Sequence, residues 1–384
     1  MDILVESTPV SFRKRIAAGF YRPELDVLRF CAFFMVFCHH IFGSETKLSK
    51  FLAEFGSLGM CLFFFLSAYL ITELLQREKR STGTIHLKAF YTRRILRIWP
   101  LYLGFLAFSL LLGALKPSMA VSSGLLWSFL LMAGNWYVGV HGLPHSPMSI
   151  LWSISLEEQF YLIWPVLSRS LGVFAARIVV IFTVVIGSLA VWNLASSGGD
   201  SVVQVWTNSF VQFQMFAMGA GLSLVLRSRL PQLKKVARLI LITTGLGLWT
   251  LATLSFGIQS PGIAESPAKL MVSYWLVGLG CVSLILGWLG MPSGYSPKVL
   301  IYLGKISYGL YVFHLLALFA AKSGIEHLES VSSFFRSQHL ILRPVKDVLA
   351  LGLTILLASG SYRFYETHFL KLKERFTIVH SRAI

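Results

Sequence analysis

Two ionisable side chains lie in the first strongly apolar stretch of the chain, residues 25–42. Arg29 and His40 are eleven positions apart, and at 100° per residue eleven steps make about three full turns plus 20°. A helix would therefore present both side chains on one face, roughly 16 Å apart along its axis, while His39 would point elsewhere. Ionisable residues inside a membrane span usually face the bundle interior and mark a substrate path, a proton relay or a polar pair. The structural alternative is that Arg29 pairs with Asp26 and that His40 ends the helix at an interface.

A second group of chemically useful residues is the arginine cluster in residues 90–100, FYTRRILRIWP. Arg94 and Arg97 are three positions apart, and Arg93 and Arg97 are four apart, so a helix would bring the guanidinium groups together. Guanidinium offers a planar fork of donors that suits phosphate groups. An anchor among lipid headgroups would use the same residues. The cluster therefore predicts either a phosphate site or a membrane anchor.

Two adjacent carboxylates, Glu157 and Glu158, interrupt a third apolar stretch, LWSISLEEQFYLIWP. Ser153 lies four positions before Glu157, and Ser155 lies three before Glu158. Like charges in apolar surroundings disfavour ionisation, so at least one of these groups needs a cationic partner or a proton. A structural pair with Arg29 or with the arginine cluster would satisfy the same requirement.

A fourth polar face lies in the segment LGKISYGLYVFH. Ser307, Tyr311 and His314 are separated by four and then three positions, which places them on one helical face in a hydrophobic background. Tyr308 lies off that face. Taken alone, such a face is typical of packing and of hydrogen bonds between helices.

The composition indicates a polytopic membrane protein. Hydrophobic residues make up 55% of the 384 and charged residues only 13%, and the mean hydropathy is +0.69, which is not the profile of a soluble globular chain. The net charge of +17 comes from basic residues in short segments between apolar runs, as the positive-inside rule expects, so a nucleic-acid partner is disfavoured. The four cysteines lie singly in apolar segments, which implies neither a disulfide framework nor a zinc site.

Ten apolar runs are long enough to cross a bilayer, so we expect an all-α fold with about ten transmembrane helices. The runs are 25–42, 55–75, 98–115, 120–138, 171–193, 206–226, 239–258, 269–289, 300–321 and 345–365. An eleventh stretch, 149–168, contains the paired glutamates. If it does not cross, the basic blocks around residues 77–97 and 227–238 and both termini all lie on the cytoplasmic side, which the positive-inside rule favours. We therefore expect 149–168 to be a non-crossing or interfacial helix.

The predicted domains are a cytoplasmic basic segment (1–24), one membrane domain (25–368) and a cytoplasmic basic tail (369–384). The basic start resembles a signal peptide, but the apolar run after it carries charges and no small-residue cleavage pattern, so we expect a retained first span. The arrangement suits a multi-pass protein of a bacterial-type cytoplasmic membrane.

Taken in order, these segments resemble the membrane-bound acyltransferase 3 family. YRPELDVLRFCAFFMVFCHH is similar to the opening RPELDGLRA pattern of the family and to its motif of Arg, ten residues and His, met here by Arg29 and His40. FGSLGMCLFFFLSAYLIT, RRILRIWPLY, WSISLEEQFYLIWP and GKISYGLYVFH follow in the family's order. Three places depart from the family pattern: Met60-Cys61 instead of Val-Asp, Ala68-Tyr69 instead of Gly-Phe, and Thr-His after Glu366 instead of proline.

The resemblance implies an integral-membrane O-acyltransferase that moves an acyl group, most commonly acetyl, from cytoplasmic acyl-CoA to a hydroxyl of a cell-surface or lipid-linked carbohydrate. His40 is then the expected base, because imidazole titrates near neutral pH. Arg93, Arg94 and Arg97 would meet the CoA phosphates, and Arg29 would hold the donor or orient a carboxylate such as Glu158. Both direct transfer and a covalent acyl-His40 intermediate are compatible with the sequence.

The expected partners are acyl-CoA as donor substrate, a carbohydrate or glycolipid acceptor and the lipid bilayer, with no tightly bound cofactor and no metal. The alternative from another class is a proton-coupled transporter or flippase of a polar or lipid-linked substrate, since intramembrane Arg, His and Glu would also suit that role. Transporters often show paired halves with interrupted helices. No such pairing is evident in this sequence.

Overall fold

The computed structural model describes residues 21–43, 46–197, 202–256, 266–332, 334, 337 and 339–379. Throughout these residues the secondary structure is helical, with no strand, in agreement with the predicted all-α class. The helices are α2 (Pro23–Ile41), α3 (Lys47–Thr82), α4 (Leu87–Leu115), α5 (Ser123–Leu130), α6 (Gly134–His141), α7 (Leu151–Ser170), α8 (Val173–Ser196), α9 (Val202–Thr207), α10 (Ser209–Leu226), α11 (Lys235–Phe256), α12 (Pro267–Trp288), α13 (Lys298–Lys305), α14 (Ser307–Val331), α16 (His339–Ser361) and α17 (Thr367–Glu374). Short 3-10 turns (Pro117–Met119, Pro147–Ile150 and Ser293–Tyr295) and a π turn (Tyr362–Glu366) connect some of them.

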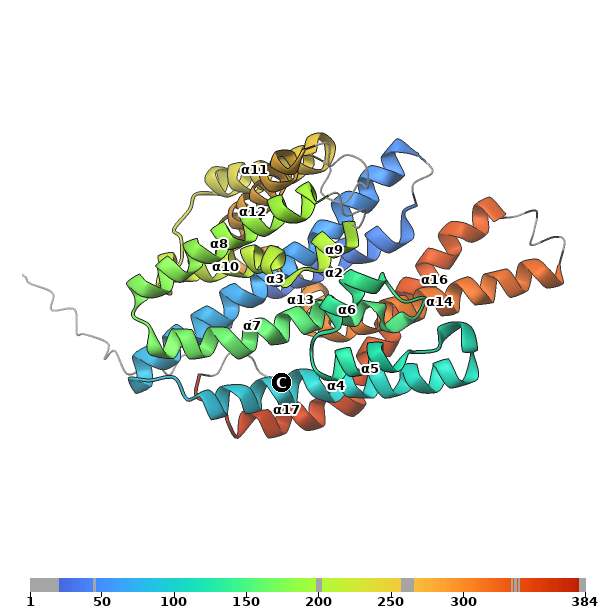
Figure 1. Cartoon of the computed structure of the whole chain (residues 1–384), viewed down its shortest axis with the longest axis horizontal. Coiled ribbons are helices and arrows are strands. Elements are labelled where there is room, and N and C mark those ends of the chain that lie inside the picture. Colours follow the sequence, from blue (N-terminus) through green and yellow to red (C-terminus); the bar gives the residue numbers. More distant parts are fainter. Residues whose placement is uncertain are drawn as a thin grey trace, which may run out of the picture.

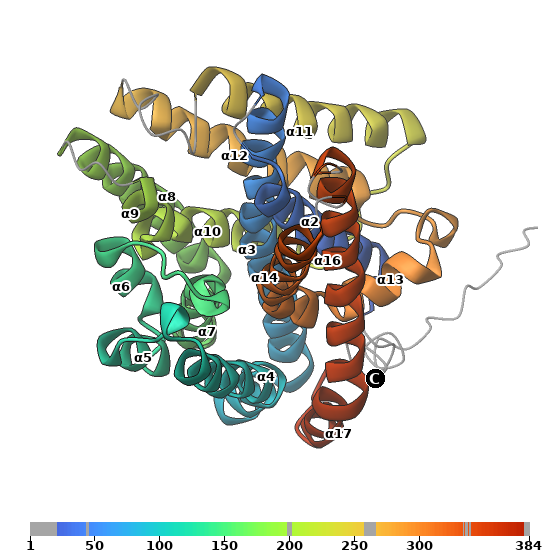
Figure 2. The ribbon, with the colours of Figure 1, turned by 90° about the vertical axis from the view of Figure 1, so that its right-hand side faces the viewer.

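Helix α3 forms the centre of the bundle, and the other long helices surround it (Figure 2). It has 36 residues and begins with a reciprocal capping box, in which Thr46 and Ser49 each bond the other's backbone N–H. This satisfies donors that a helix start leaves free. The helix ends at Gly83, whose φ of +79° is the left-handed conformation that favours glycine at a C-terminus. Most of its middle section is buried, so α3 supplies the wall that the functional segments share.

Helix α2 packs very closely on α3 because two glycines of α3 face its backbone. A Cβ at Gly56 would lie 2.6 Å from the Met35 carbonyl oxygen, and a Cβ at Gly59 would clash with the carbonyl oxygen of Ala32. Small residues allow backbones to approach in this way inside membrane bundles. The close approach fixes the orientation of α2 and so the directions in which Arg29 and His40 point.

Seven helices in the described part of the chain are long and apolar enough to cross a membrane: α3, α4, α8, α10, α11, α12 and α14. They match predicted spans, whereas α2 carries acidic and basic residues in its first turns. Helix α7, which contains the paired glutamates, is not among the seven. The count of ten crossings and the non-crossing status of 149–168 stay predictions.

Two of the expected spans differ from the structure. The stretch 120–138 is not one span but two eight-residue helices, α5 and α6, each about 12 Å long and too short for a core of about 30 Å. The chain turns between them at Met132, which has a φ of +54° and whose carbonyl accepts a bond from Gln159. The stretch 300–321 breaks at Ile306, so α13 ends there and the spanning helix α14 begins at Ser307.

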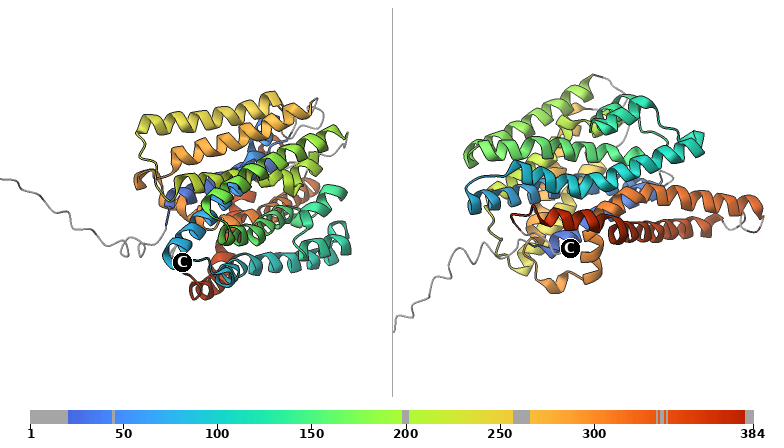
Figure 3. Two further views of the ribbon diagram at one scale, coloured as in Figure 1. Left: turned by 60° about the vertical axis from the view of Figure 1, so that its left-hand side comes forward. Right: turned by 90° about the horizontal axis from the view of Figure 1, so that it is seen from below.

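Helices α14 and α16 form an antiparallel pair that projects from one end of the bundle (Figures 1 and 3). After the π turn, α17 lies along the first turns of α4 (Figure 1). The C-terminal helix therefore reaches the arginine cluster, about 270 residues away in the sequence.

Candidate active site

Four cavities lie inside the bundle between the first turns of α4 and the end of α2. The mouth cavity, between α3, α4 and α17, has a volume of about 50 Å³, and the arginine cavity, between α2, α3 and α4, about 70 Å³. The middle cavity, between α2, α3, α7 and α14, measures about 50 Å³, and the histidine cavity, at the end of α2, about 150 Å³. Glu78, Arg93 and Lys373 line the mouth cavity, and Asp26 and Tyr161 line the arginine cavity. The middle cavity is lined by Phe63, Glu157 and Ser307. The histidine cavity is lined by His39, His40, Trp152 and Trp206.

Neighbouring cavities in this series share wall residues. Arg94 and Arg97 line both the mouth cavity and the arginine cavity, Arg29 lines both the arginine cavity and the middle cavity, and Met60 and Tyr311 line both the middle cavity and the histidine cavity. Neighbouring cavities are thus separated by side chains that belong to both walls. The series leads from the arginine cluster to His40.

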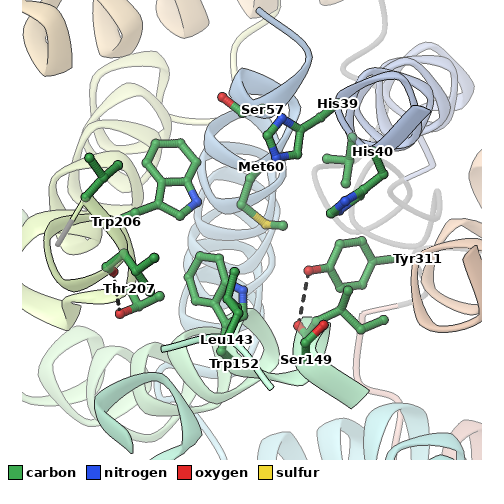
Figure 4. Close-up of a pocket in the computed structure, with 14 residues that line it drawn as sticks. His39, His40, Ser57, Met60, Leu143, Ser149, Trp152, Trp206, Thr207 and Tyr311 are labelled. Carbon is green, nitrogen blue, oxygen red and sulfur yellow. Dashed lines mark hydrogen bonds between the residues drawn. The ribbon is translucent and has the colours of Figure 1, made fainter. Parts of the chain in front are cut away.

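The histidine cavity collects side chains from five helices. His40 comes from the end of α2, Met60 from α3, Trp152 from α7, Trp206 from α9 and Tyr311 from α14. Figure 4 shows the two indoles across the cavity from His40 and Tyr311, with Met60 between them. Most of the lining surface is apolar, as in many ligand pockets, and His40 is one of the polar side chains that reach it.

The ring of His40 contacts a second imidazole, that of His314 on α14. Their ring centroids are 5.1 Å apart, and His314 is fully buried. Nδ1 of His314 lies within hydrogen-bond distance of the Tyr311 carbonyl oxygen, which can only accept, so we assign the proton to Nδ1 and a lone pair to Nε2. In the described part of the chain, this buried Nε2 has no hydrogen-bond partner. An acceptor is therefore held beside His40.

His39 has a structural contact that His40 lacks. Its Nδ1 lies 2.8 Å from the Ala53 carbonyl oxygen and donates to it, which ties the end of α2 to α3. The ring also lines the histidine cavity, although it does not share the helical face of Arg29. Of the two adjacent imidazoles, His40 is the one for which no ring nitrogen bonds a backbone carbonyl in the described part of the chain.

Arg29 shares the middle cavity with Glu157 and not with Glu158. Ser67 donates to Glu157 Oε1 at 2.8 Å, and Tyr161 donates to its Oε2 at 3.2 Å. Glu158 points instead toward α4, where Trp99 Nε1 donates to its Oε2 at 3.0 Å. The carboxylate beside Arg29 is thus Glu157, whereas the sequence favoured Glu158 for that role.

The polar face of α14 points inward, as its spacing predicts. Ser307, Tyr311 and His314 are all buried. The Tyr311 hydroxyl lies 2.6 Å from Ser153 Oγ and 3.2 Å from the Ile150 carbonyl oxygen, so the ring in the wall between two cavities is held by hydrogen bonds to α7 and the turn before it. Tyr308 donates to the Ile98 carbonyl oxygen at 2.9 Å and joins α14 to α4.

The three arginines of the cluster differ in what they contact. Arg93 donates to Glu78 Oε2 at 2.9 Å and to the Phe376 carbonyl oxygen at 2.7 Å. Arg94 lies over the rings of Phe90 and Tyr161, each 5.6 Å from its guanidinium carbon. For Arg97, no hydrogen bond or ion pair joins it to another residue within the described ranges. Arg94 and Arg97 are therefore the two whose guanidinium groups are open to an anion in the cavities.

The family profile for an acyltransferase domain matches residues 22–363. The chain belongs to the acyltransferase 3 family. A Staphylococcus aureus (strain MSSA476) protein named as a candidate O-acetyltransferase is 27% identical over 372 residues, which cover 91% of this chain and 58% of the relative. The peptidoglycan O-acetyltransferase OatA of Listeria monocytogenes is 26% identical over 368 residues, with 90% and 55% covered.

The chain thus spans somewhat more than half the length of these curated relatives. A Bacillus subtilis (strain 168) protein named as a candidate peptidoglycan O-acetyltransferase is similar to the same extent, 26% over 370 residues. No solved structure matches the chain. The family assignment and the apolar helices together make this chain an acyltransferase domain within a multi-pass membrane protein.

Several lining residues are not among the site residues that the sequence predicts. Trp206 reaches the histidine cavity from the six-residue helix α9, and Lys373 reaches the mouth cavity from α17. Trp152 and Met60 look like ordinary core residues of apolar stretches. The described residues contain no group of three or more His, Cys, Asp or Glu side chains that could hold a metal ion.

Proposed function

We propose that the chain is an integral-membrane O-acyltransferase that moves an acyl group, acetyl above all, from cytoplasmic acyl-CoA to a hydroxyl of a cell-surface or lipid-linked carbohydrate. The observation that carries the proposal is the series of cavities between Arg94 and Arg97 at one end and His40 at the other. A long, flexible thioester with phosphates at one end matches a path with cations at one end and a base at the other.

The donor's phosphates bind at Arg94 and Arg97, since guanidinium groups form paired, charge-assisted hydrogen bonds to phosphate oxygens. The pantetheine arm then passes Arg29 and Glu157 in the middle cavity. Because Met60 and Tyr311 stand between that cavity and the next, rotation of a side chain there opens the way for the thioester to reach His40.

In the reaction, the acceptor hydroxyl attacks the carbonyl carbon of the thioester. His40 takes the hydroxyl proton as the new C–O bond forms, which is general-base catalysis. The C–S bond then breaks, and the thiolate of CoA leaves and takes up a proton. His314 Nε2, a buried acceptor beside His40, stabilises the imidazolium by accepting a hydrogen bond from its second N–H.

The carbohydrate acceptor is supported by the names of the relatives. The OatA protein of Listeria monocytogenes is named as a peptidoglycan O-acetyltransferase, and peptidoglycan is a cell-surface polymer with free hydroxyls. In the proposed topology, both termini and the arginine cluster face the cytoplasm of a bacterial-type inner membrane. The donor enters from that side, and the histidine cavity receives the acceptor on the other.

The decisive experiment is an acetyl-transfer assay with the purified protein in lipid vesicles. Acetyl-CoA and a peptidoglycan-derived oligosaccharide are supplied, and both the release of free CoA thiol and the mass of the acetylated sugar are measured. We expect the wild-type protein to form both products in equal amounts. The His40→Ala variant should lose at least about a hundredfold in rate, the scale of one general base.

A matched control is His141→Ala. Like His40, His141 lies in the last turn of its helix and is exposed, but it does not line the histidine cavity. This variant should keep wild-type transfer. A His40→Ala protein that transfers acetyl at the wild-type rate would remove the proposed base, and a wild-type protein that releases no CoA in the presence of acceptors would overturn the function.

A further inference from the structure

The C-terminal helix α17 adds a cation to the mouth cavity that the family motifs do not contain. Helix α17 lies against the first turns of α4 (Figure 1), with Leu370 buried and Lys371 exposed. Lys373 is partly buried and lines the mouth cavity together with Arg94 and Arg97. One lysine of this helix therefore faces solvent, and another faces the cavity.

The charges around Lys373 are mostly positive. The guanidinium groups of Arg93, Arg94 and Arg97 act on it from α4, against its neighbour Glu374. The other carboxylate in the cavity, Glu78 of α3, is already held by Arg93 at 2.9 Å and by the backbone N–H of His86 at 2.7 Å.

Burial first, and then the positive charges of Arg97 and Arg94, lower the pKa of Lys373 from its usual 10.5 to about 7. No ion pair to Lys373 is formed within the described ranges. An anion in the mouth cavity would favour the charged ammonium, because an opposite charge close by stabilises it. The mouth cavity therefore carries more positive than negative charge, and a bound anion would balance it.

We infer that Lys373 binds the 3′-phosphate of the donor nucleotide and so selects CoA over its dephosphorylated form. The inference rests on the proposed function. In CoA the thiol is followed by the pantetheine arm, then by the pyrophosphate and last by the ribose with its 3′-phosphate. With the thiol directed toward His40 and the pyrophosphate at Arg94 and Arg97, the 3′-phosphate lies outermost, where Lys373 is.

Nucleotide binding tests the inference independently of catalysis. The detergent-solubilised protein is titrated with adenosine 3′,5′-bisphosphate and with adenosine 5′-monophosphate, which differ only in the 3′-phosphate. We expect the wild-type protein to prefer the bisphosphate by about ten- to a hundredfold, the scale of one hydrogen bond to a charged group. The Lys373→Gln variant should lose most of this preference.

Two further variants separate charge from structure. Lys371→Gln removes an exposed lysine of the same helix and should keep the wild-type preference, and Lys373→Arg keeps the cation and should retain most of it. A titration in the presence of phosphatidylglycerol micelles distinguishes a nucleotide site from a headgroup site. The nucleotide preference should persist in those micelles.

The inference fails if the wild-type protein binds both nucleotides equally, if Lys373→Gln keeps the full preference, or if phosphatidylglycerol abolishes it. These outcomes leave the proposed transfer reaction intact, because that reaction is measured with acetyl-CoA and an acceptor. Conversely, a protein that shows the preference but releases no CoA supports the nucleotide site and contradicts the transferase proposal.

Discussion

The pair of imidazoles at the end of α2 leads to a specific prediction about His314. We replace it by Phe, a ring of similar size that can keep the aromatic contacts with Phe33 and Tyr311. The substitution removes Nε2, the buried acceptor beside His40 that has no partner in the described part of the chain. It also removes the bond from Nδ1 to the Tyr311 carbonyl.

The size of the effect follows from what Nε2 does when His40 carries the substrate proton. An imidazolium has two N–H donors, and one of them would lack an acceptor in the His314→Phe protein. A hydrogen bond to a charged group contributes about 1.5–3 kcal/mol. At about 1.4 kcal/mol per factor of ten, kcat should fall about ten- to 150-fold. The KM for acetyl-CoA should change little, because His314 does not line the mouth cavity or the arginine cavity.

The assay is CoA release in vesicles at saturating acceptor, with kcat and KM determined separately. His141→Phe is the control, since it also replaces a histidine that bonds a carbonyl on its own helix but lies outside the histidine cavity. If His314→Phe keeps a kcat within twofold of the wild type while the protein stays monodisperse, the assignment of Nε2 as the partner of His40 is refuted.

Three further predictions concern the path, the packing and the donor site. Met60→Trp should lower acetyl transfer at least tenfold, because the bulkier indole would block the passage between the middle and histidine cavities. Binding of adenosine 3′,5′-bisphosphate should be unchanged, and weakened nucleotide binding would argue against a local block. Gly59→Ala should destabilise the protein by about 1–3 kcal/mol and lower the apparent Tm in detergent, since the new Cβ would clash with the Ala32 carbonyl oxygen. The control Gly247→Ala places its Cβ in open space and should not lower the Tm. Equal melting temperatures for the two variants would contradict the close approach of α2 and α3. Because the lowered pKa of Lys373 is about 7, its amine is protonated below that pH and progressively loses its charge above it. The affinity for the bisphosphate, measured by calorimetric titration, should therefore fall between pH 7 and about 9. The Lys373→Gln variant should show no such fall.

The helical face shared by Arg29 and His40 could be predicted from the sequence, and so could the inward face of α14. Both depend on local periodicity, which a single helix expresses once it forms. The compact arginine cluster follows from the same rule. The membrane class follows from hydropathy alone, because long apolar runs leave few other folds available.

The tertiary structure decided which of these faces meet and what separates them. Adjacent residues on a helix point about 100° apart, so only the packing of α7 against α3 and α4 determines that Glu157, and not Glu158, shares a cavity with Arg29. The break at Met132 and the return of α17 to the arginine cluster likewise depend on contacts between segments far apart in the chain. The periodicity of a sequence predicts the faces of one helix at a time. These features depend instead on how several helices pack together, so they could not be predicted from the sequence alone.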